Sequence, residues 1–163
     1  MNEVTQALHT VPFFENFDTQ YLGRLSDVTD MKTYSEGSVI FRQGDSAETL
    51  HIVLAGNVAL EICASGVGCK KILTLTHGDL LGWSPALQQE RLTATARALT
   101  DVTTLQLHSH ELLAMCEAEP KFGYEFMKRA ALALAKRLSA TRLQLMNIYG
   151  SEMPPAGTLP KST

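Results

Sequence analysis

The chain has 163 residues, an apolar fraction of 45% and a formal net charge of -3 at pH 7. This length suits one domain with a buried core, and the apolar fraction argues against global disorder. The slight acidic excess gives no broad attraction to phosphate backbones, so we expect no direct DNA binding. No apolar run approaches the roughly 20 residues of a membrane helix, and residues 1–10 lack a secretion signal. We therefore expect a cytoplasmic protein that does not contact a membrane.

The first 30 residues are predicted to form a helical lead-in. A helix over residues 1–9 should end before Pro12, because proline disfavours helical geometry in the residue before it. Asp18 can cap a second helix. The apolar positions of that helix recur at helical spacing and are Tyr21, Leu22, Leu25 and Val28. The phenylalanines at 13, 14 and 17 are expected to anchor this lead-in to the core.

From Met31 the apolar period changes toward two, and Gly and Asp mark turns. Strands are predicted over residues 38–41, 49–55, 57–63, 70–76, 92–98 and 102–108. Short, evenly punctuated strands favour an antiparallel β-roll or jelly-roll over a parallel sheet with crossover helices. The expected class is α+β, with a β-roll over residues 31–108 between the helical lead-in and C-terminal helices over 109–149.

The three cysteines, Cys63, Cys69 and Cys116, are odd in number and lack the C-x-x-C spacing of a metal site. Cys63 and Cys69 could face each other across a hairpin. In a reducing compartment we nevertheless expect thiols at all three positions, and neither a disulfide nor zinc.

Two helices are expected to close the domain. Ser109 should cap a short helix through Glu117 that Pro120 ends. Residues 121–149 then form a long helix with one apolar stripe, which contains Phe126, Ala130, Leu134, Leu138, Thr141, Leu145 and Ile148. Its first half can pack on the domain itself. For its second half we favour pairing with another copy, which predicts a homodimer built between Phe126 and Ile148. Residues 150–163 are expected to be a loose tail, too short for a helix-turn-helix reader.

The sequence Gly78-Asp79-Leu80-Leu81-Gly82-Trp83-Ser84-Pro85 interrupts the strands. Ser84 and Pro85 are typical of a helix start, where free N–H groups favour an anion. Together with residues 36–45 and 50–58, this segment resembles the glycine-marked roll of the cyclic nucleotide-binding domain in the cyclic-AMP receptor protein superfamily. The resemblance covers roughly residues 10–148. It implies a β-roll flanked by helices, and regulated ligand binding instead of turnover.

The resemblance also implies a site, from which this sequence departs twice. In the family, a Glu after the second glycine accepts from the ribose 2′-hydroxyl, and an Arg-(Ser or Thr)-Ala motif holds the phosphate. Here Trp83 stands at the Glu position, and an indole only donates. In Arg91-Leu92-Thr93-Ala94, the arginine is displaced by one residue, which in a strand turns its side chain to the other face. A bulge at Leu92, or a position of Arg91 in the loop before the strand, would re-aim it. The predicted ligand-binding residues are Gly82, Trp83, Ser84, Arg91, Thr93 and Ala94.

Arg91 is the best candidate for contacting an anion, because a guanidinium matches phosphate oxygens. The equally weighted alternative is a solvated loop arginine beside Glu90, and Arg97 is the fallback. No nucleophile–base set and no metal-ligand cluster is recognisable, so we expect no catalysis and no bound metal.

We therefore predict a regulatory module that senses a small anionic ligand, a cyclic nucleotide or a variant of one, and signals through its last helix to a regulatory protein that the sequence does not identify. Cyclic AMP or cyclic GMP should bind weakly at most. The alternative is a ligand-free dimerisation or protein-interaction module that keeps only the scaffold.

Overall fold

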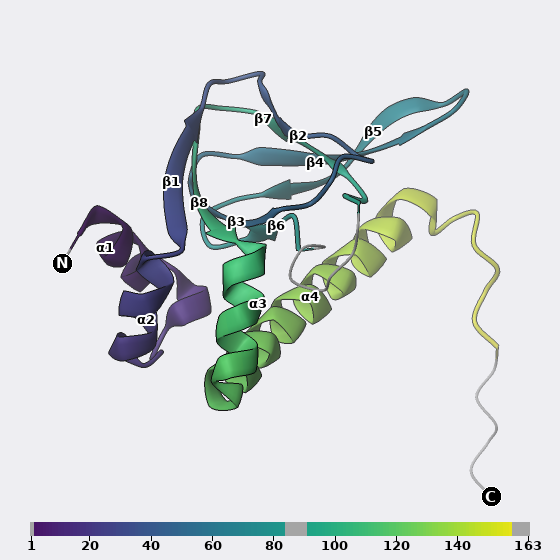
Figure 1. The fold of residues 1–163 in the computed structure, drawn as a ribbon. Coiled ribbons are helices and arrows are strands. Elements are labelled where there is room, and N and C mark those ends of the chain that lie inside the picture. The colour runs from purple at the N-terminus through teal and green to yellow at the C-terminus, as the bar shows by residue number, and fades with distance from the viewer. Residues whose placement is uncertain (1, 84–90, 158–163) are drawn as a thin grey trace, which may run out of the picture.

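The computed structural model describes residues 2–83 and 91–157. Helices α1 (Glu3–Thr10) and α2 (Thr19–Ser26) flank a 3-10 turn (Pro12–Phe14) and precede the strands. The strands are β1 (Thr29–Tyr34), β2 (Val39–Phe41), β3 (Thr49–Ala55), β4 (Val58–Ala64), β5 (Gly68–Leu75), β6 (Leu80–Leu81), β7 (Thr95–Ala98) and β8 (Val102–His108). Helices α3 (Ser109–Ala118) and α4 (Pro120–Tyr149) follow, and all the helices lie on one side of the roll (Figure 1).

The helical lead-in is confirmed, with small shifts at its ends. The Asn2 side chain accepts a 2.7 Å hydrogen bond from the Thr5 N–H and caps α1. Asp18 caps α2 as predicted, since its carboxylate accepts a 2.8 Å bond from the Gln20 N–H. Capping side chains thus fix where both helices begin.

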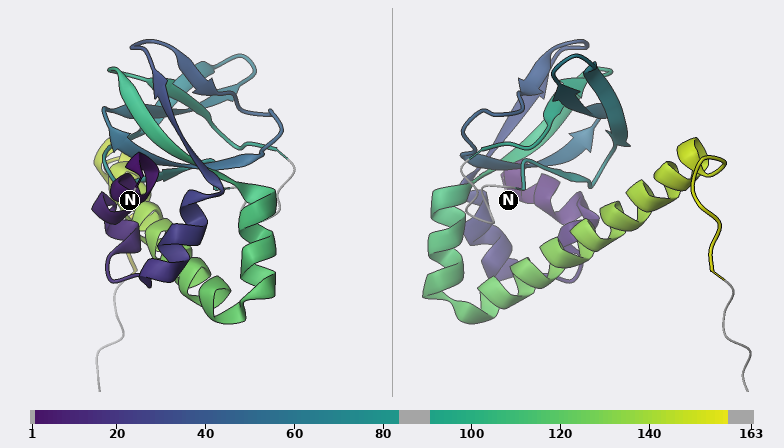
Figure 2. Two further views of the ribbon diagram at one scale, coloured as in Figure 1. Left: turned by 60° about the vertical axis from the view of Figure 1, so that its left-hand side comes forward. Right: turned by 90° about the vertical axis from the view of Figure 1, so that its right-hand side faces the viewer.

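The described strands form two four-stranded antiparallel sheets, in the orders β1-β8-β3-β6 and β2-β7-β4-β5 (Figures 1 and 2). This confirms the α+β β-roll with helices before and after it. Strands β3 and β8 have the predicted bounds. Strand β1 and the two-residue β6 were not predicted, because polar residues dominate β1 and β6 is too short for a period to register.

The β1-β8-β3-β6 sheet separates two cores. Its outer face packs against the helices through Leu50, Ile52, Leu80, Leu105 and Leu107. The lead-in phenylalanines belong to this outer core, where Phe13 lies edge-on to Phe126 of α4 and Phe17 edge-on to Phe122. A smaller core inside the roll includes Val53, Val58, Leu81 and Val102. Segments far apart in the chain therefore meet on α4.

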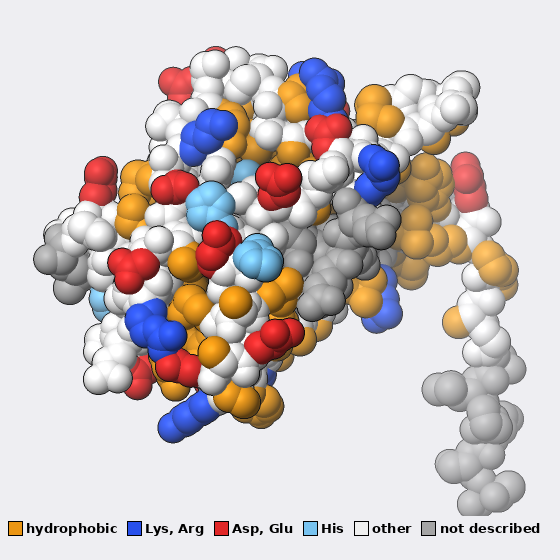
Figure 3. Space-filling model, in the orientation of Figure 1, with side chains coloured by type: hydrophobic (Ala, Val, Ile, Leu, Met, Phe, Trp, Pro, Cys, Tyr) orange, Lys and Arg blue, Asp and Glu red, His pale blue; other side chains and the backbone are white. Residues whose placement is uncertain are grey.

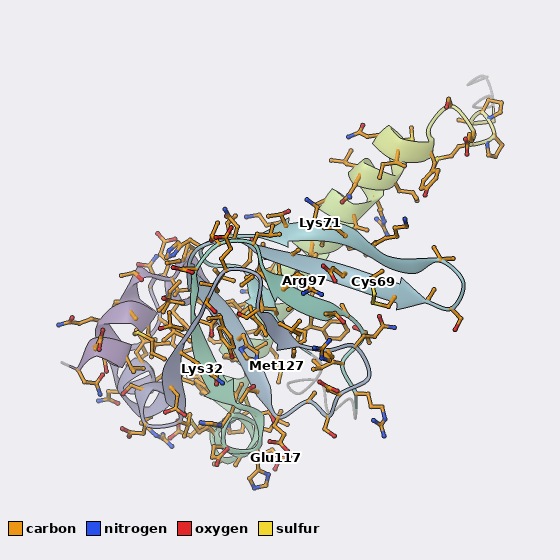
Figure 4. The ribbon with its side chains drawn as sticks, turned by 90° about the horizontal axis from the view of Figure 1, so that it is seen from above. Lys32, Cys69, Lys71, Arg97, Glu117 and Met127 are labelled. Atoms are coloured by element: carbon orange, nitrogen blue, oxygen red, sulfur yellow. A yellow bond between two sulfur atoms is a disulfide. The ribbon has the colours of Figure 1, made fainter. Side chains whose placement is uncertain are left out.

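The prediction of thiols is wrong for Cys63 and Cys69. The β4–β5 hairpin pairs them directly, with Cα atoms 4.0 Å apart, and a disulfide joins them (Figure 4). Directly opposed residues in an antiparallel ladder can lie close enough for this bond, and spacing along the sequence does not reveal the register. Cys116 is a free thiol, as predicted.

Ser109 is not the N-cap that we predicted. His108 holds that position, and the Ser109 hydroxyl donates a 2.8 Å hydrogen bond to the Glu48 carbonyl instead. Pro120 opens α4, where its missing N–H is unneeded. Phe122, Phe126 and Ala130 are buried in the first half of α4. The second half extends beyond the roll (Figure 2).

Candidate ligand-binding site

The Gly82 segment, which we define as residues 78–83, includes β6 and pairs with β3. Gly82 has a φ of +68°, a conformation that side chains rarely adopt. A Cβ atom there would lie 3.1 Å from the Thr49 carbonyl oxygen and 3.3 Å from Cδ2 of His51. Gly78 donates a 2.8 Å hydrogen bond to the Val53 carbonyl and closes the preceding turn. Gly78 and Gly82 therefore bring this segment into direct contact with β3.

Trp83 is partly buried and packs on the outer core. Ser84 and the short helix predicted to begin there lie outside the described residues. The sequence prediction that Trp83 faces a ligand stays a prediction.

Arg91 lies on the surface, against the Gly44 turn. Its Nη1 donates a 2.8 Å hydrogen bond to the Gly44 carbonyl, and its backbone forms an isolated bridge with Ser46. The next residue, Leu92, is only 7% exposed. The one-residue displacement seen in the sequence thus corresponds to an inward leucine and an outward arginine.

The remaining predicted site residues lie just before β7. Thr93 is exposed and Ala94 is partly buried. The fallback, Arg97, lies in β7 and donates a 3.0 Å hydrogen bond to Glu61 of β4 (Figure 4). The structure therefore gathers Gly82 with His51 and Thr49, whereas Arg91 and Arg97 are each engaged by other parts of the roll.

His51 is a neighbour of Gly82 that the sequence analysis missed. It is 5% exposed, its Nε2 lies 3.1 Å from Thr49 Oγ1, and its Nδ1 has no hydrogen-bond partner among the described residues. Burial, assisted by the positive charge of Lys32, lowers its pKa from 6.5 to about 4. His51 is therefore neutral near pH 7. Its alternation with Thr49 and Val53 on β3 was the available signal, since all three belong to one face.

Two arginines join α4 to the rest of the domain. Arg137 donates to the Leu80 carbonyl, two residues before Gly82, and its Nη1 is buried without a partner among the described residues. Burial lowers the pKa of the Arg137 guanidinium, although the Asp79 carboxylate opposes this. Arg129 donates to the carbonyls of Phe13 and Glu15, at 2.6 and 2.8 Å. A cleft of about 870 Å³ lies beside these contacts, between α4, the lead-in and the Gly82 segment. Neither arginine belongs to the apolar stripe from which α4 was predicted.

Comparison with known proteins identifies this architecture. The family model of the cyclic nucleotide-binding domain matches residues 31–119, more than half of the chain. The chain belongs to the cyclic nucleotide-binding domain family. In this domain, the match runs from β1 through α3 and includes the Gly82 segment.

The relatives of this cyclic nucleotide-binding domain are distant. It is 28% identical to isozyme 1 of the cGMP-dependent protein kinase of Drosophila melanogaster over 131 residues, which is 76% of this chain and 17% of the kinase. It is 27% identical to the cyclic AMP receptor protein of Thermus thermophilus over 134 residues, 82% of this chain and 60% of that protein. The chain thus spans less than two thirds of both relatives.

Solved structures agree on the fold. The catabolite activator protein of Thermus thermophilus superposes with a TM-score of 0.67 at 26% identity, over 84% of this chain and 62% of that one. A cyclic nucleotide-binding domain from Methylobacillus flagellatus gives a TM-score of 0.76 over 94% of this chain and 84% of that one, and its 16% identity supports the fold alone. No helix among residues 2–83 and 91–157 is both long and apolar enough to cross a membrane.

Proposed function

We propose that this cyclic nucleotide-binding domain is a non-catalytic regulatory module, in which a small anionic ligand bound at the Gly82 segment changes the position of α4. The observation that carries the proposal is the hydrogen bond from Arg137 to the Leu80 carbonyl. It links the long helix to the backbone that leads into Gly82. A ligand that favours one arrangement of this segment therefore also favours one arrangement of α4.

The arginine contacts support α4 as the output element. Arg129 holds the first half of the helix to the lead-in, and Arg137 holds its middle to the roll. Beyond them, the helix is largely exposed. A shift at Leu80 can therefore alter the path of the second half while the buried Phe122 and Phe126 keep the first half in place.

The second half of α4 is proposed to pair with another copy of the chain. Orange atoms gather over the C-terminal end of α4 in Figure 3. The exposed large apolar side chains on this half are Leu138, Leu143, Leu145, Met146, Ile148 and Tyr149, and three of them, Leu138, Leu145 and Ile148, belong to the predicted stripe. Leu138→Glu combined with Leu145→Glu should give monomers, because charges would enter the seam. Asn147→Glu adds a charge at another exposed position on this half and should leave the dimer intact. Sedimentation showing a monomeric parent, or a dimer that survives the double substitution, would refute pairing through this surface.

Ordinary cyclic AMP or cyclic GMP is expected to bind weakly. Trp83 cannot accept the ribose hydroxyl bond, and a hydroxyl buried without a partner costs about 1–3 kcal/mol, or about one to two decades of affinity. Arg91 already donates to the Gly44 carbonyl, and Leu92 faces inward. We therefore expect a high-micromolar dissociation constant at best.

Trp83 and the displaced Arg91 also favour a second candidate, a ligand-free dimerisation or protein-interaction module. A thermal-shift panel of cyclic mono- and dinucleotides separates the two candidates, because a ligand that binds only the folded state raises the melting temperature. Trp83, the only tryptophan in the sequence, provides a fluorescence check. A concentration-dependent rise with one nucleotide supports sensing. A flat panel together with an intact dimer overturns it in favour of the second candidate.

A further inference from the structure

The inner face of the β1-β8-β3-β6 sheet is polar at one end of the roll. The register pairs His51 of β3 with Gln106 of β8, and Lys32 of β1 with Thr104 of β8. Since side chains alternate along a strand, Tyr34 shares this face with Lys32. Of these residues, His51 and Thr104 are buried, and buried positions of a sheet are normally apolar, so these two need a reason other than packing.

Lys32, Tyr34, His51 and Gln106 line a cavity of about 230 Å³. Phe41, Leu92 and Ile40 form an apolar wall of it, and Glu48 contributes the other charged side chain in its lining. The volume is below the roughly 300–1,000 Å³ of sites for drug-sized ligands. It therefore suits a molecule smaller than a nucleotide.

Three polar groups at this cavity have bonding capacity to spare. The Lys32 ammonium lies 5.1 Å from the centroid of the Tyr34 ring, and no ion pair involves it among the described residues. The Tyr34 oxygen accepts a 2.6 Å hydrogen bond from Gln106 Nε2, which leaves the phenolic proton free to donate. His51 Nδ1 is buried and lacks a partner among the described residues. A buried polar atom without a partner costs free energy that a bound ligand can recover.

We propose that this cavity is a second binding site, which takes a small carboxylic acid with an apolar body. The carboxylate lies between the Lys32 ammonium and the Tyr34 hydroxyl, and the apolar body lies against Phe41 and Leu92. The His51 ring borders the cavity, so its signals report whether the cavity is occupied. The carboxylate of Glu48 disfavours a doubly charged phosphate, because the lining offers one lysine only. This proposal does not depend on cyclic nucleotide binding.

Benzoate is a suitable probe, with benzamide as its neutral counterpart of the same shape. Binding is followed by the ¹⁵N signals of the histidine side chains in the full chain. Benzoate should move the His51 signal in a saturable manner, with a dissociation constant of about 1 mM or lower. The exposed His110 should not respond. Benzamide should bind at least about tenfold more weakly, because it cannot form the charge-assisted contact with Lys32.

Lys32→Gln tests the assigned cation without disturbing the core, since Lys32 is exposed. It should lower benzoate affinity about tenfold, to the level of benzamide, whereas Lys121→Gln at the exposed start of α4 should leave it unchanged. Three results would overturn the proposal. They are a His51 signal that ignores benzoate, equal binding of benzoate and benzamide, and equal losses in the two lysine variants.

Discussion

On its outer face, the β1-β8-β3-β6 sheet presents Leu50, Ile52 and Leu105 to the helices, and all three are at most 1% exposed. On its inner face, the same strands present His51 and Thr104, which are also buried but carry atoms without hydrogen-bond partners among the described residues. One sheet therefore supports two kinds of surface. The outer face provides packing energy, whereas the inner face keeps polar groups that cost stability, which is typical of a surface retained for binding.

The largest effect is expected on the outer face. Leu105→Ala removes a fully buried side chain between the sheet and the helices. The free energy of unfolding should fall by about 2–5 kcal/mol, from lost apolar burial and the cavity left behind. Urea unfolding of the parent and variant measures this. A loss below about 1 kcal/mol would mean that the outer face does not provide most of the packing energy of this sheet.

The second prediction concerns pH and the inner face. His51 has a pKa of about 4 in the folded protein and 6.5 as its ordinary value. The unfolded chain therefore binds a proton first as the pH falls. The resulting stability, about 3 kcal/mol, is fully present above about pH 6.5 and is lost as the pH falls through about 4.

His51→Gln cannot titrate and serves as the control for that loss. Urea unfolding of both proteins between pH 7 and pH 4 should show a steeper loss of stability in the parent. Parallel curves for the two proteins would show that His51 is not held neutral by the fold.

The smallest predicted change is in the stability of two variants in which a buried threonine becomes valine, and the change should differ in sign between them. Thr104 Oγ1 is buried without a partner among the described residues, whereas the buried Thr29 hydroxyl donates a 2.6 Å bond to the Leu25 carbonyl. Thr104→Val should leave stability unchanged or raise it by about 1 kcal/mol, and Thr29→Val should lower it by about 1 kcal/mol. Thermal unfolding of both variants measures the difference. If both variants lose the same stability, the Thr104 hydroxyl has a hydrogen-bond partner and the contrast between the two faces is wrong.

The sequence predicted β3 and β8, which carry both faces, but not which residues meet on the inner face. Outer-face residues such as Ile52 and Leu105 belong to strands β3 and β8, whose bounds were predicted from the apolar pattern. The strand β1, which carries Lys32, is mostly polar and was missed. His51 appeared isolated because its neighbour Gly82 lies 31 positions away in the sequence and meets it only through the register of β3 and β6.

In the candidate site, the displacement of Arg91 can be read from the sequence alone. Its orientation cannot, because the strand predicted from residue 92 begins only at Thr95 and Arg91 forms an isolated bridge with Ser46 before it. The hydrogen bonds from Arg91 to Gly44 and from Arg137 to Leu80 depend on long-range packing. The Cys63–Cys69 disulfide depends on the register of the hairpin. Local patterns do not contain this information.

We propose that ligand binding at the Gly82 segment is passed to α4 through Arg137. Hydrogen–deuterium exchange with saturating cyclic AMP or cyclic GMP tests it directly, with Trp83 fluorescence confirming occupancy. In the parent, exchange should change both around residues 80–83 and in the second half of α4. In Arg137→Met, only the change around residues 80–83 should persist. An occupied parent in which α4 exchanges as it does without ligand would show that the ligand does not act on α4, and a variant that responds like the parent would show that Arg137 does not couple them.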